Sequence, residues 1–150
     1  MKVTGIRIFT SLYHTRSRKL YMANREAARA LIIERIAYFS LRYGVQVGRV
    51  AIKNLKSRWG SCSRKGNLNF SYKLAFLDPR LRDYIIVHEL CHLREFNHGK
   101  GFWSLVAETV PDYKECMRQL RSGRDDIFSS ADAIPGYPSC RPAELKTVPA

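Results

Sequence analysis

Three residues near the middle of the chain, His88, Glu89 and His92, follow an HExxH pattern. On an α-helix, residues i and i+4 lie only about 40° from superposition, so both imidazoles project from one face. Two imidazoles supply two of the three protein ligands of a catalytic zinc. Glu89 can then reach a zinc-bound water, whose pKa zinc lowers to about 7, and act as its general acid and base.

The same three residues have a simpler interpretation, because HExxH occurs by chance and paired histidines on a buried helix can be core residues. Two observations favour a metal site. The surrounding segment, residues 81–93, is apolar on nearly every other side, so two histidines and a glutamate within it need an explanation. Three of the four histidines also fall within eleven residues of sequence.

A catalytic zinc needs a third protein ligand, and His98 is the first candidate. It follows His92 by six residues, or about 600° along a helix, so a continuous helix would point it elsewhere. The chain must therefore leave the helix between them. In the extended metzincin pattern a glycine makes this turn, but Glu95 stands at that position here. Asn97 and Gly99, which flank His98, can adopt left-handed backbone angles and are expected to turn the chain instead.

Two other side chains remain as alternative ligands. Glu108 is the first, because a carboxylate from a following helix completes other HExxH sites. Cys62 is the second, because thiolate binds zinc well, although a buried thiol is the ordinary interpretation. The four cysteines of the chain form no CxxC pair, and we expect reduced thiols rather than a disulfide framework.

Strands are predicted from alternation of apolar and polar residues. Residues 6–10 predict a short strand or an ordered N-terminal arm. Residues 50–55 predict the first arm of a hairpin, with a turn at 64–66 and a second arm over 68–76. The second arm should bury one face, formed by Leu68, Phe70, Tyr72, Leu74 and Phe76.

Helices are predicted from apolar residues that recur every three or four positions. One should cover about 18–43 and end at Gly44; its buried residues should be Ala28, Ile32, Ile36, Phe39 and Tyr43. The pair Asp78-Pro79 should cap the helix that carries the HExxH pattern. Two shorter helices should begin near Gly101 and Pro111.

Length and composition are those of one ordinary domain. The 150 residues suit a single α+β domain over 1–122, followed by a flexible tail at 123–150. No stretch approaches the ~20 apolar residues of a membrane helix. The N-terminal residues contain no apolar signal-peptide core, so a cytoplasmic protein without membrane association is expected.

Positive charge is concentrated in the first half of the chain. Residues 1–80 contain 17 Lys and Arg against three acids, whereas residues 81–122 contain six of each. A basic half suggests attraction to a polyanion such as nucleic acid. A soluble surface that happens to be basic is the alternative.

Several separated motifs occur in an order that resembles one known family. They are SRWGSCS at 57–63, GNLN at 66–69, HELCHL at 88–93, Asn97-His98 with Phe102-Trp103, and PDY at 111–113. Over about residues 45–122 the chain resembles the YgjP-like metallopeptidases, which are related to the SprT-like and WLM zinc proteases. The resemblance implies a small zincin-like fold with one Zn2+ held by His88, His92 and His98, and with Glu89 as the catalytic acid and base.

The resemblance also implies a zinc metalloendopeptidase that acts on peptide or protein substrates. In zincin folds a strand above the active-site helix pairs with extended substrate, so the segment 49–77 is the expected template. Arg58 is a candidate for the substrate cleft or for packing, and Tyr113 is a candidate for oxyanion stabilisation or for the core. The alternatives are a basic nucleic-acid-associated protein, such as a SprT-like protease of DNA-bound proteins, and a latent zincin scaffold. The sequence does not indicate an oligomeric state.

Overall fold

The computed structural model describes the backbone of residues 5–123 and the side chains of residues 17–123. In chain order the elements are α1 (Gly5–Tyr43), β1 (Val50–Lys53), β2 (Gly60–Cys62), β3 (Leu68–Ser71), the 3-10 helix η1 (Tyr72–Phe76), α2 (Pro79–Cys91), α3 (Lys100–Thr109) and α4 (Tyr113–Ser122). The strands form one mixed sheet in the order β1-β3-β2, so the predicted α+β fold class is confirmed. Residues 124–150 of the predicted tail lie outside the described part of the chain.

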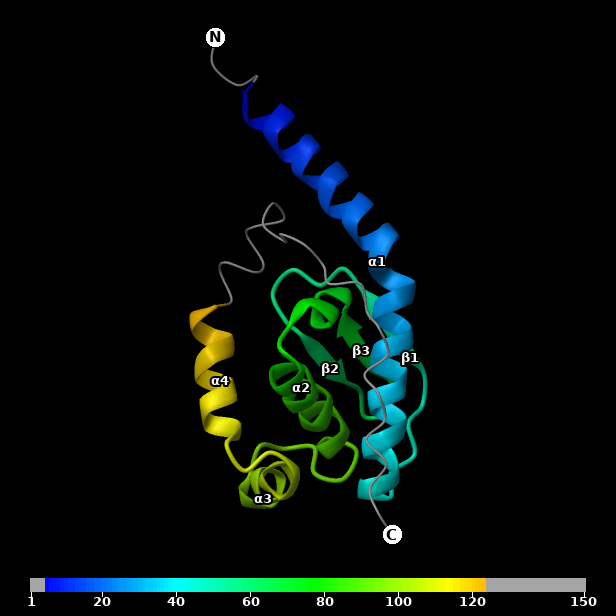
Figure 1. Cartoon of the computed structure of the whole chain (residues 1–150), viewed down its shortest axis with the longest axis vertical. Helices are drawn as coiled ribbons and strands as arrows, with labels where there is room; N and C mark the ends of the chain where they lie inside the picture. The colour runs from blue at the N-terminus through cyan, green and yellow to red at the C-terminus, as the bar shows by residue number, and fades with distance from the viewer. Residues whose placement is uncertain (1–4, 124–150) are drawn as a thin grey trace.

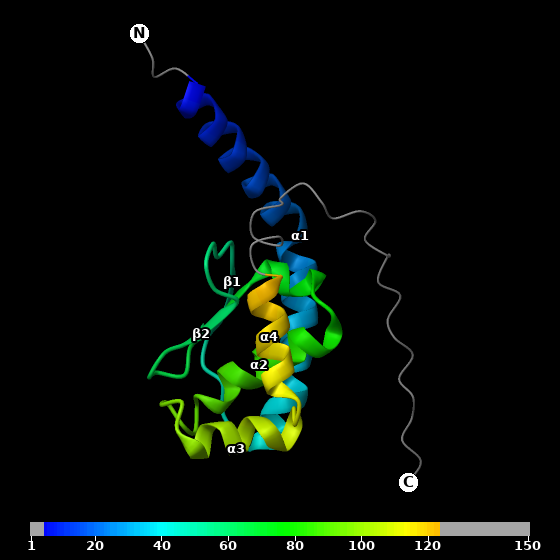
Figure 2. The same cartoon turned by 90° about the vertical axis from the view of Figure 1, so that its left-hand side faces the viewer.

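α1 is a single helix of 39 residues, and its N-terminal part extends beyond the rest of the domain (Figures 1 and 2). The predicted strand or arm at residues 6–10 is therefore wrong. No proline or glycine occurs between Gly5 and Gly44 to end the helix early, and alternation over so few residues also fits a helix. Gly44 ends α1 as predicted, with a left-handed φ of 60°. None of the helices in residues 5–123 is long and apolar enough to cross a membrane.

The C-terminal half of α1 packs on the core through the predicted face. Its five predicted residues are all buried: Ala28, Ile32, Ile36, Phe39 and Tyr43. The Arg35 guanidinium donates two hydrogen bonds of 2.9 and 2.8 Å to the Asp83 carboxylate on α2. The Tyr43 hydroxyl donates to the Leu105 carbonyl oxygen on α3 at 2.9 Å. These polar contacts attach α1 to the two helices that carry and flank the HExxH pattern.

The sheet differs from the predicted hairpin in how its strands pair. β1 lies parallel to β3, with Val50 opposite Leu68, whereas β2 lies antiparallel to β3, with Cys62 opposite Leu68. The hairpin is therefore β2–β3 with its turn at residues 63–66, and residues 50–55 are not its first arm. The prediction was wrong because β2 is too short to show an alternating pattern, so β1 was the only visible candidate.

β3 is shorter than predicted. It ends at Ser71, and the segment as far as Phe76 forms the 3-10 helix η1. The Ser71 hydroxyl accepts a hydrogen bond from the Lys73 backbone N–H, a local bond that competes with continued strand pairing. The burial pattern is nevertheless as predicted for Leu68, Phe70, Tyr72 and Leu74, which are all buried.

α2 occupies the centre of the molecule, between α1 and α4 (Figure 1). It contacts α1, β2, α3 and α4, which explains why its buried residues lie on nearly all sides. Its start is as predicted: the Asp78 carboxylate accepts a 2.9 Å hydrogen bond from the Arg80 backbone N–H, and Pro79 occupies the first turn. The first turn of this central helix is therefore fixed by its cap.

Replacement of Asp78 by alanine should lower the free energy of unfolding by about 1 kcal/mol, because a backbone N–H at the start of α2 loses its acceptor. Asp78→Asn is the matched control, since its amide oxygen can accept the same bond and should keep stability near wild type. Urea denaturation with excess chelator measures both, without a metal contribution to the folded state. Equal stability of Asp78→Ala and Asp78→Asn would contradict the role of the cap.

Candidate metal centre

The imidazoles of His88, His92 and His98 converge at the C-terminal end of α2. Their ligand nitrogens all lie within 4.8 Å of one another, and the Nε2 atoms of His88 and His98 are 3.1 Å apart. Two nitrogens bound tetrahedrally at zinc distances are about 3.3 Å apart, so this spacing suits one ion. Among the His, Cys, Asp and Glu side chains of the described residues, these three histidines form the group whose ligand atoms lie close enough together to hold one metal ion. The structure thus brings together all three predicted ligands.

The protonation of the His88 and His92 imidazoles also suits a metal. His92 Nδ1 lies 3.2 Å from the Glu95 carbonyl oxygen, which only accepts, so Nδ1 carries the proton and Nε2 keeps its lone pair. Burial, with smaller effects of His92 and His98, lowers the pKa of His88 to about 3. Burial also lowers the pKa of His92. Neutral imidazole is the form that binds metal.

The backbone leaves α2 between His92 and His98 without a left-handed residue. The N–H groups of residues 93–94 donate to carbonyl groups three positions back, so the last turn of the helix tightens. Asn97 and Gly99 were expected to adopt left-handed angles, and neither does. The expectation was wrong because a tightened turn redirects the chain without reversing the sign of φ.

Two aromatic residues of α3 form the frame of the cluster. The ring centroid of Phe102 lies 4.8 Å from that of His88, 4.5 Å from His92 and 4.7 Å from His98, and Phe102 is fully buried. Trp103 lies 5.7 Å from His98 with the two rings nearly parallel. The motif that contains Phe102 was recognised in the sequence, but the contact of Phe102 with all three imidazoles was not predicted. The sequence signal available for this contact was the spacing of four residues between His98, just before α3, and Phe102, in its first turn.

Glu89 lies buried between α2 and β2, with an exposed fraction of 7%. Burial raises the pKa of its carboxyl to about 7, while the positive charge of Arg58 opposes the rise. A Cβ atom at Gly60 on β2 would lie 3.0 Å from Glu89 Oε1, so glycine at this position leaves the space that the carboxyl occupies. A carboxyl with a pKa near 7 can exchange protons at neutral pH.

The alternative ligands do not join the cluster. Glu108 is exposed on α3, where its charge acts on Tyr43 and Cys91. Cys62 is half-buried, and its pKa is raised to about 11, first by burial and second by the charge of Glu89. A thiol with so high a pKa is protonated at neutral pH. As expected, the described cysteines are free thiols: Cys62, Cys91 and Cys116.

The two predicted supporting residues occupy different environments. Arg58 is exposed, and its charge acts on the Glu89 carboxyl. Tyr113, at the start of α4, is half-buried and stacks on Trp103, with ring centroids 4.9 Å apart and 15° between the ring planes. Trp103 in turn contacts the rings of His88 and His98. Tyr113 is thus connected to the cluster through one aromatic side chain.

Comparison with known proteins identifies the family. A family model described as "YgjP-like, metallopeptidase domain" matches residues 6–123. The chain belongs to the YgjP-like family. This confirms the resemblance seen in the motifs, and it extends the match from about residue 45 back into α1. The YgjP-like chain is therefore a metallopeptidase, with peptides or proteins as substrates and with a metal that is typically zinc.

Two solved structures are similar to this YgjP-like chain. The metallopeptidase zymogen of Pyrococcus abyssi abylysin is 25% identical, with a TM-score of 0.56 and coverage of 62% of this chain and 95% of its own. The metallopeptidase zymogen of Methanocaldococcus jannaschii jannalysin is 22% identical, with a TM-score of 0.56 and coverage of 62% and 96%, and shows the shared fold. No curated protein matches the chain significantly.

The geometry predicts about one zinc per chain, with His98 as the third ligand. His98→Ala should lower zinc affinity by more than about a hundredfold, because loss of a ligand exceeds the effect of outer contacts. Glu108→Ala removes the competing candidate and should keep wild-type affinity. Metal analysis after dialysis and chelator competition measure both variants. Zinc loss in Glu108→Ala, with retention in His98→Ala, would contradict this ligand set.

Proposed function

We propose that this chain is a zinc endopeptidase in which His88, His92 and His98 hold the metal and Glu89 is the general acid and base. One observation carries the proposal: three imidazoles converge within 4.8 Å beside a buried carboxyl. Three nitrogen ligands with room for a fourth are the donor set of catalytic zinc. A zinc ion bound there would supply Lewis-acid activation of a water and of the substrate carbonyl.

The residues of the chain supply orientation and proton transfer. Glu89, enclosed between α2 and β2, accepts a proton from the attacking water at a carboxylate oxygen and passes it to the leaving amine. Its pKa of about 7 permits both steps near neutral pH. Arg58 keeps a fraction of this carboxyl ionised, because its positive charge favours the carboxylate. Tyr113 is the candidate donor to the developing oxyanion.

β2 is the proposed template for the substrate. The strand order β1-β3-β2 leaves β2 at an edge of the sheet, and β2 contacts α2 beside the candidate metal centre. An extended peptide can add to such an edge through main-chain hydrogen bonds. The template predicted over 49–77 is thereby narrowed to the three residues of β2, Gly60–Cys62.

A nucleic-acid-associated protein is the second candidate. Two segments that carry exposed cations meet where Asn54 Nδ2 donates a 2.9 Å hydrogen bond to Ser17 Oγ: Lys53 precedes Asn54, and Arg18 and Lys19 follow Ser17 on α1. Binding through phosphates would weaken steeply with salt.

Latency of the enzyme also stays a prediction. The similar structure of abylysin is that of a metallopeptidase zymogen.

Glu89→Gln should retain zinc but lose hydrolysis by about a hundredfold or more, because the amide cannot accept the proton. Glu108→Gln makes the same chemical change on an exposed carboxylate of α3 and should keep wild-type activity. Zinc content and the hydrolysis rate of a quenched-fluorescence peptide library measure the two effects separately. Full activity in Glu89→Gln would refute the proposed acid and base.

Gly60→Ala should lower kcat/KM by about tenfold to a hundredfold while zinc stays bound, because the added methyl displaces the Glu89 carboxyl from its position. Gly99→Ala is the matched control, since a Cβ there meets no atom within 4 Å and its φ is −83°. Both variants are compared by peptide hydrolysis and by metal analysis. Unchanged activity in Gly60→Ala would show that Glu89 does not need this space.

A further inference from the structure

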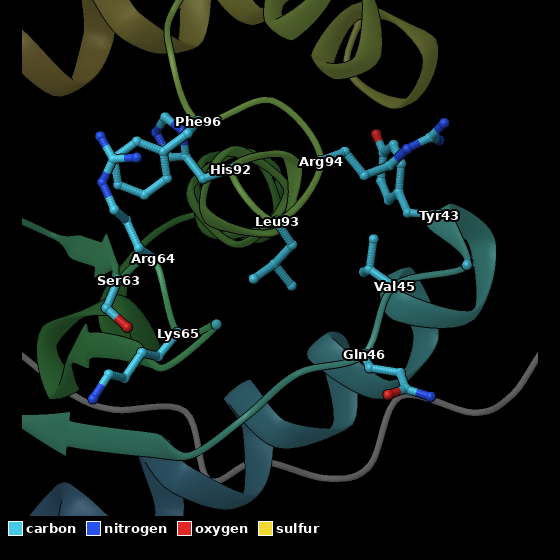
Figure 3. Close-up of a pocket in the computed structure, with 12 residues that line it drawn as sticks. Tyr43, Val45, Gln46, Ser63, Arg64, Lys65, His92, Leu93, Arg94 and Phe96 are labelled. Carbon is cyan, nitrogen blue, oxygen red and sulfur yellow. The ribbon is translucent and has the colours of Figure 1, made fainter.

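A cavity of about 580 Å³ lies beside the candidate metal centre. It is lined by residues 43–46 at the end of α1, residues 63–66 after β2, and residues 92–94 with Phe96 after α2. Figure 3 shows Leu93 and Val45 pointing into the space between these segments. His92 belongs both to this lining and to the imidazole cluster, so the cavity adjoins the site of hydrolysis.

β2 connects the two regions. Gly60, at its start, faces Glu89, and the turn 63–66 that follows its end lines the cavity. A strand advances about 3.3 Å per residue, so an extended peptide paired with β2 passes from Glu89 to the cavity within a few residues. A substrate residue near the scissile bond therefore reaches this cavity.

Cations line the cavity, and acidic side chains do not. The cationic lining residues are Arg64, Lys65 and Arg94. All three are exposed, and within residues 17–123 none of them forms an ion pair with Asp or Glu. The nearby Glu95 carboxylate points towards Gly101, where an added Cβ would lie 3.3 Å from its Cδ. Glu108 acts on Tyr43 from α3 but does not line the cavity.

Arg64 is held in place next to the metal centre. Its guanidinium carbon lies 4.7 Å from the ring centroid of Phe96, and that ring lies 5.8 Å from the ring of His92. Figure 3 shows Arg64 beside Phe96 and His92 on one side of the cavity, and Arg94 beside Tyr43 on the other. A guanidinium stacked on an aromatic ring loses little freedom when it binds, and its planar fork matches the two oxygens of a carboxylate.

We propose that this cavity binds a carboxylate of the peptide substrate, with Arg64 as its principal partner. This assignment rests on the proposed peptidase function. The carboxylate belongs to an Asp or Glu side chain near the scissile bond or to the C-terminus of the substrate. Leu93 and Val45 contact the aliphatic part of the bound residue. The volume is within the ~300–1,000 Å³ range of ligand pockets. The chain therefore selects peptides that place a carboxylate in this cavity.

The test uses the full chain loaded with zinc and two sets of matched peptides. The first set has an amidated C-terminus and carries Glu, Gln or Lys at each position around the scissile bond. The second set has no acidic residue and ends in either a free carboxylate or an amide. In at least one set, kcat/KM for the carboxylate should exceed that for its amide by about tenfold or more, as for a hydrogen bond to a charged group. The two sets distinguish a side chain from a chain end.

Arg64→Ala should bring this carboxylate-over-amide ratio close to unity, and Arg64→Glu should favour Lys peptides over Glu peptides. Lys114→Ala and Lys114→Glu make the same changes in net charge on α4, outside the cavity, and should keep the wild-type ratio. A ratio near unity in the wild type with both peptide sets would overturn the proposal. A wild-type ratio that persists in Arg64→Ala would overturn it as well.

Peptide binding separates failure of this proposal from failure of the peptidase function. Fluorescence anisotropy gives Kd for the same peptides without turnover. If no peptide is hydrolysed, the peptidase function fails, and the carboxylate-over-amide ratio in Kd, with its loss in Arg64→Ala, still decides the role of the cavity. An oligonucleotide that binds through Arg64, with no preference among the peptides, would assign the cations to nucleic acid and overturn the proposal.

Discussion

The imidazole cluster depends on a helix that cannot rotate. His88 and His92 both face His98 only while α2 keeps one rotation about its axis, and α1, β2, α3 and α4 contact α2 from different sides. Ile86, Val87 and Leu90 are fully buried, so rotation would expose apolar surface at a cost of about 25 cal/mol per Å². The same burial lowers the pKa of His88 and so keeps its ring neutral. Packing thus sets both the geometry and the protonation of the site.

α3 extends this constraint to the third imidazole. Phe102 contacts all three histidine rings, so the position of His98 relative to α2 depends on how α3 packs. α3 is in turn bound to the end of α1, where the Tyr43 hydroxyl donates to the Leu105 carbonyl oxygen. A continuous series of contacts therefore leads from α1 to the cluster. The family match also includes α1, although no predicted site residue lies on it.

In the proposed peptidase, β2 joins three functions within a few residues. Gly60 makes space for Glu89, the free edge of the strand offers main-chain groups to a peptide, and the turn after it carries Arg64 into the cationic cavity. Arg58, just before the strand, acts on the charge of Glu89. An edge strand suits such a role because one side is paired to the sheet while the other remains available.

The sequence by itself determined the features that depend on neighbours along the chain. The HExxH spacing, the Asp78 cap, the end of α1 at Gly44 and the buried face of α1 are local patterns, and all appear in the structure. Proximity of His98 to the other two histidines was predicted from its type and distance in sequence, and the structure agrees.

Only the tertiary structure decided the features that depend on which distant segments meet. These are the parallel pairing of β1 with β3, the tightened exit from α2, the contact of Phe102 with three imidazoles, and the cavity lined from three separate segments. Periodicity reports which face of an element is buried. It contains no information about which segment covers that face, and so it could not predict these four features.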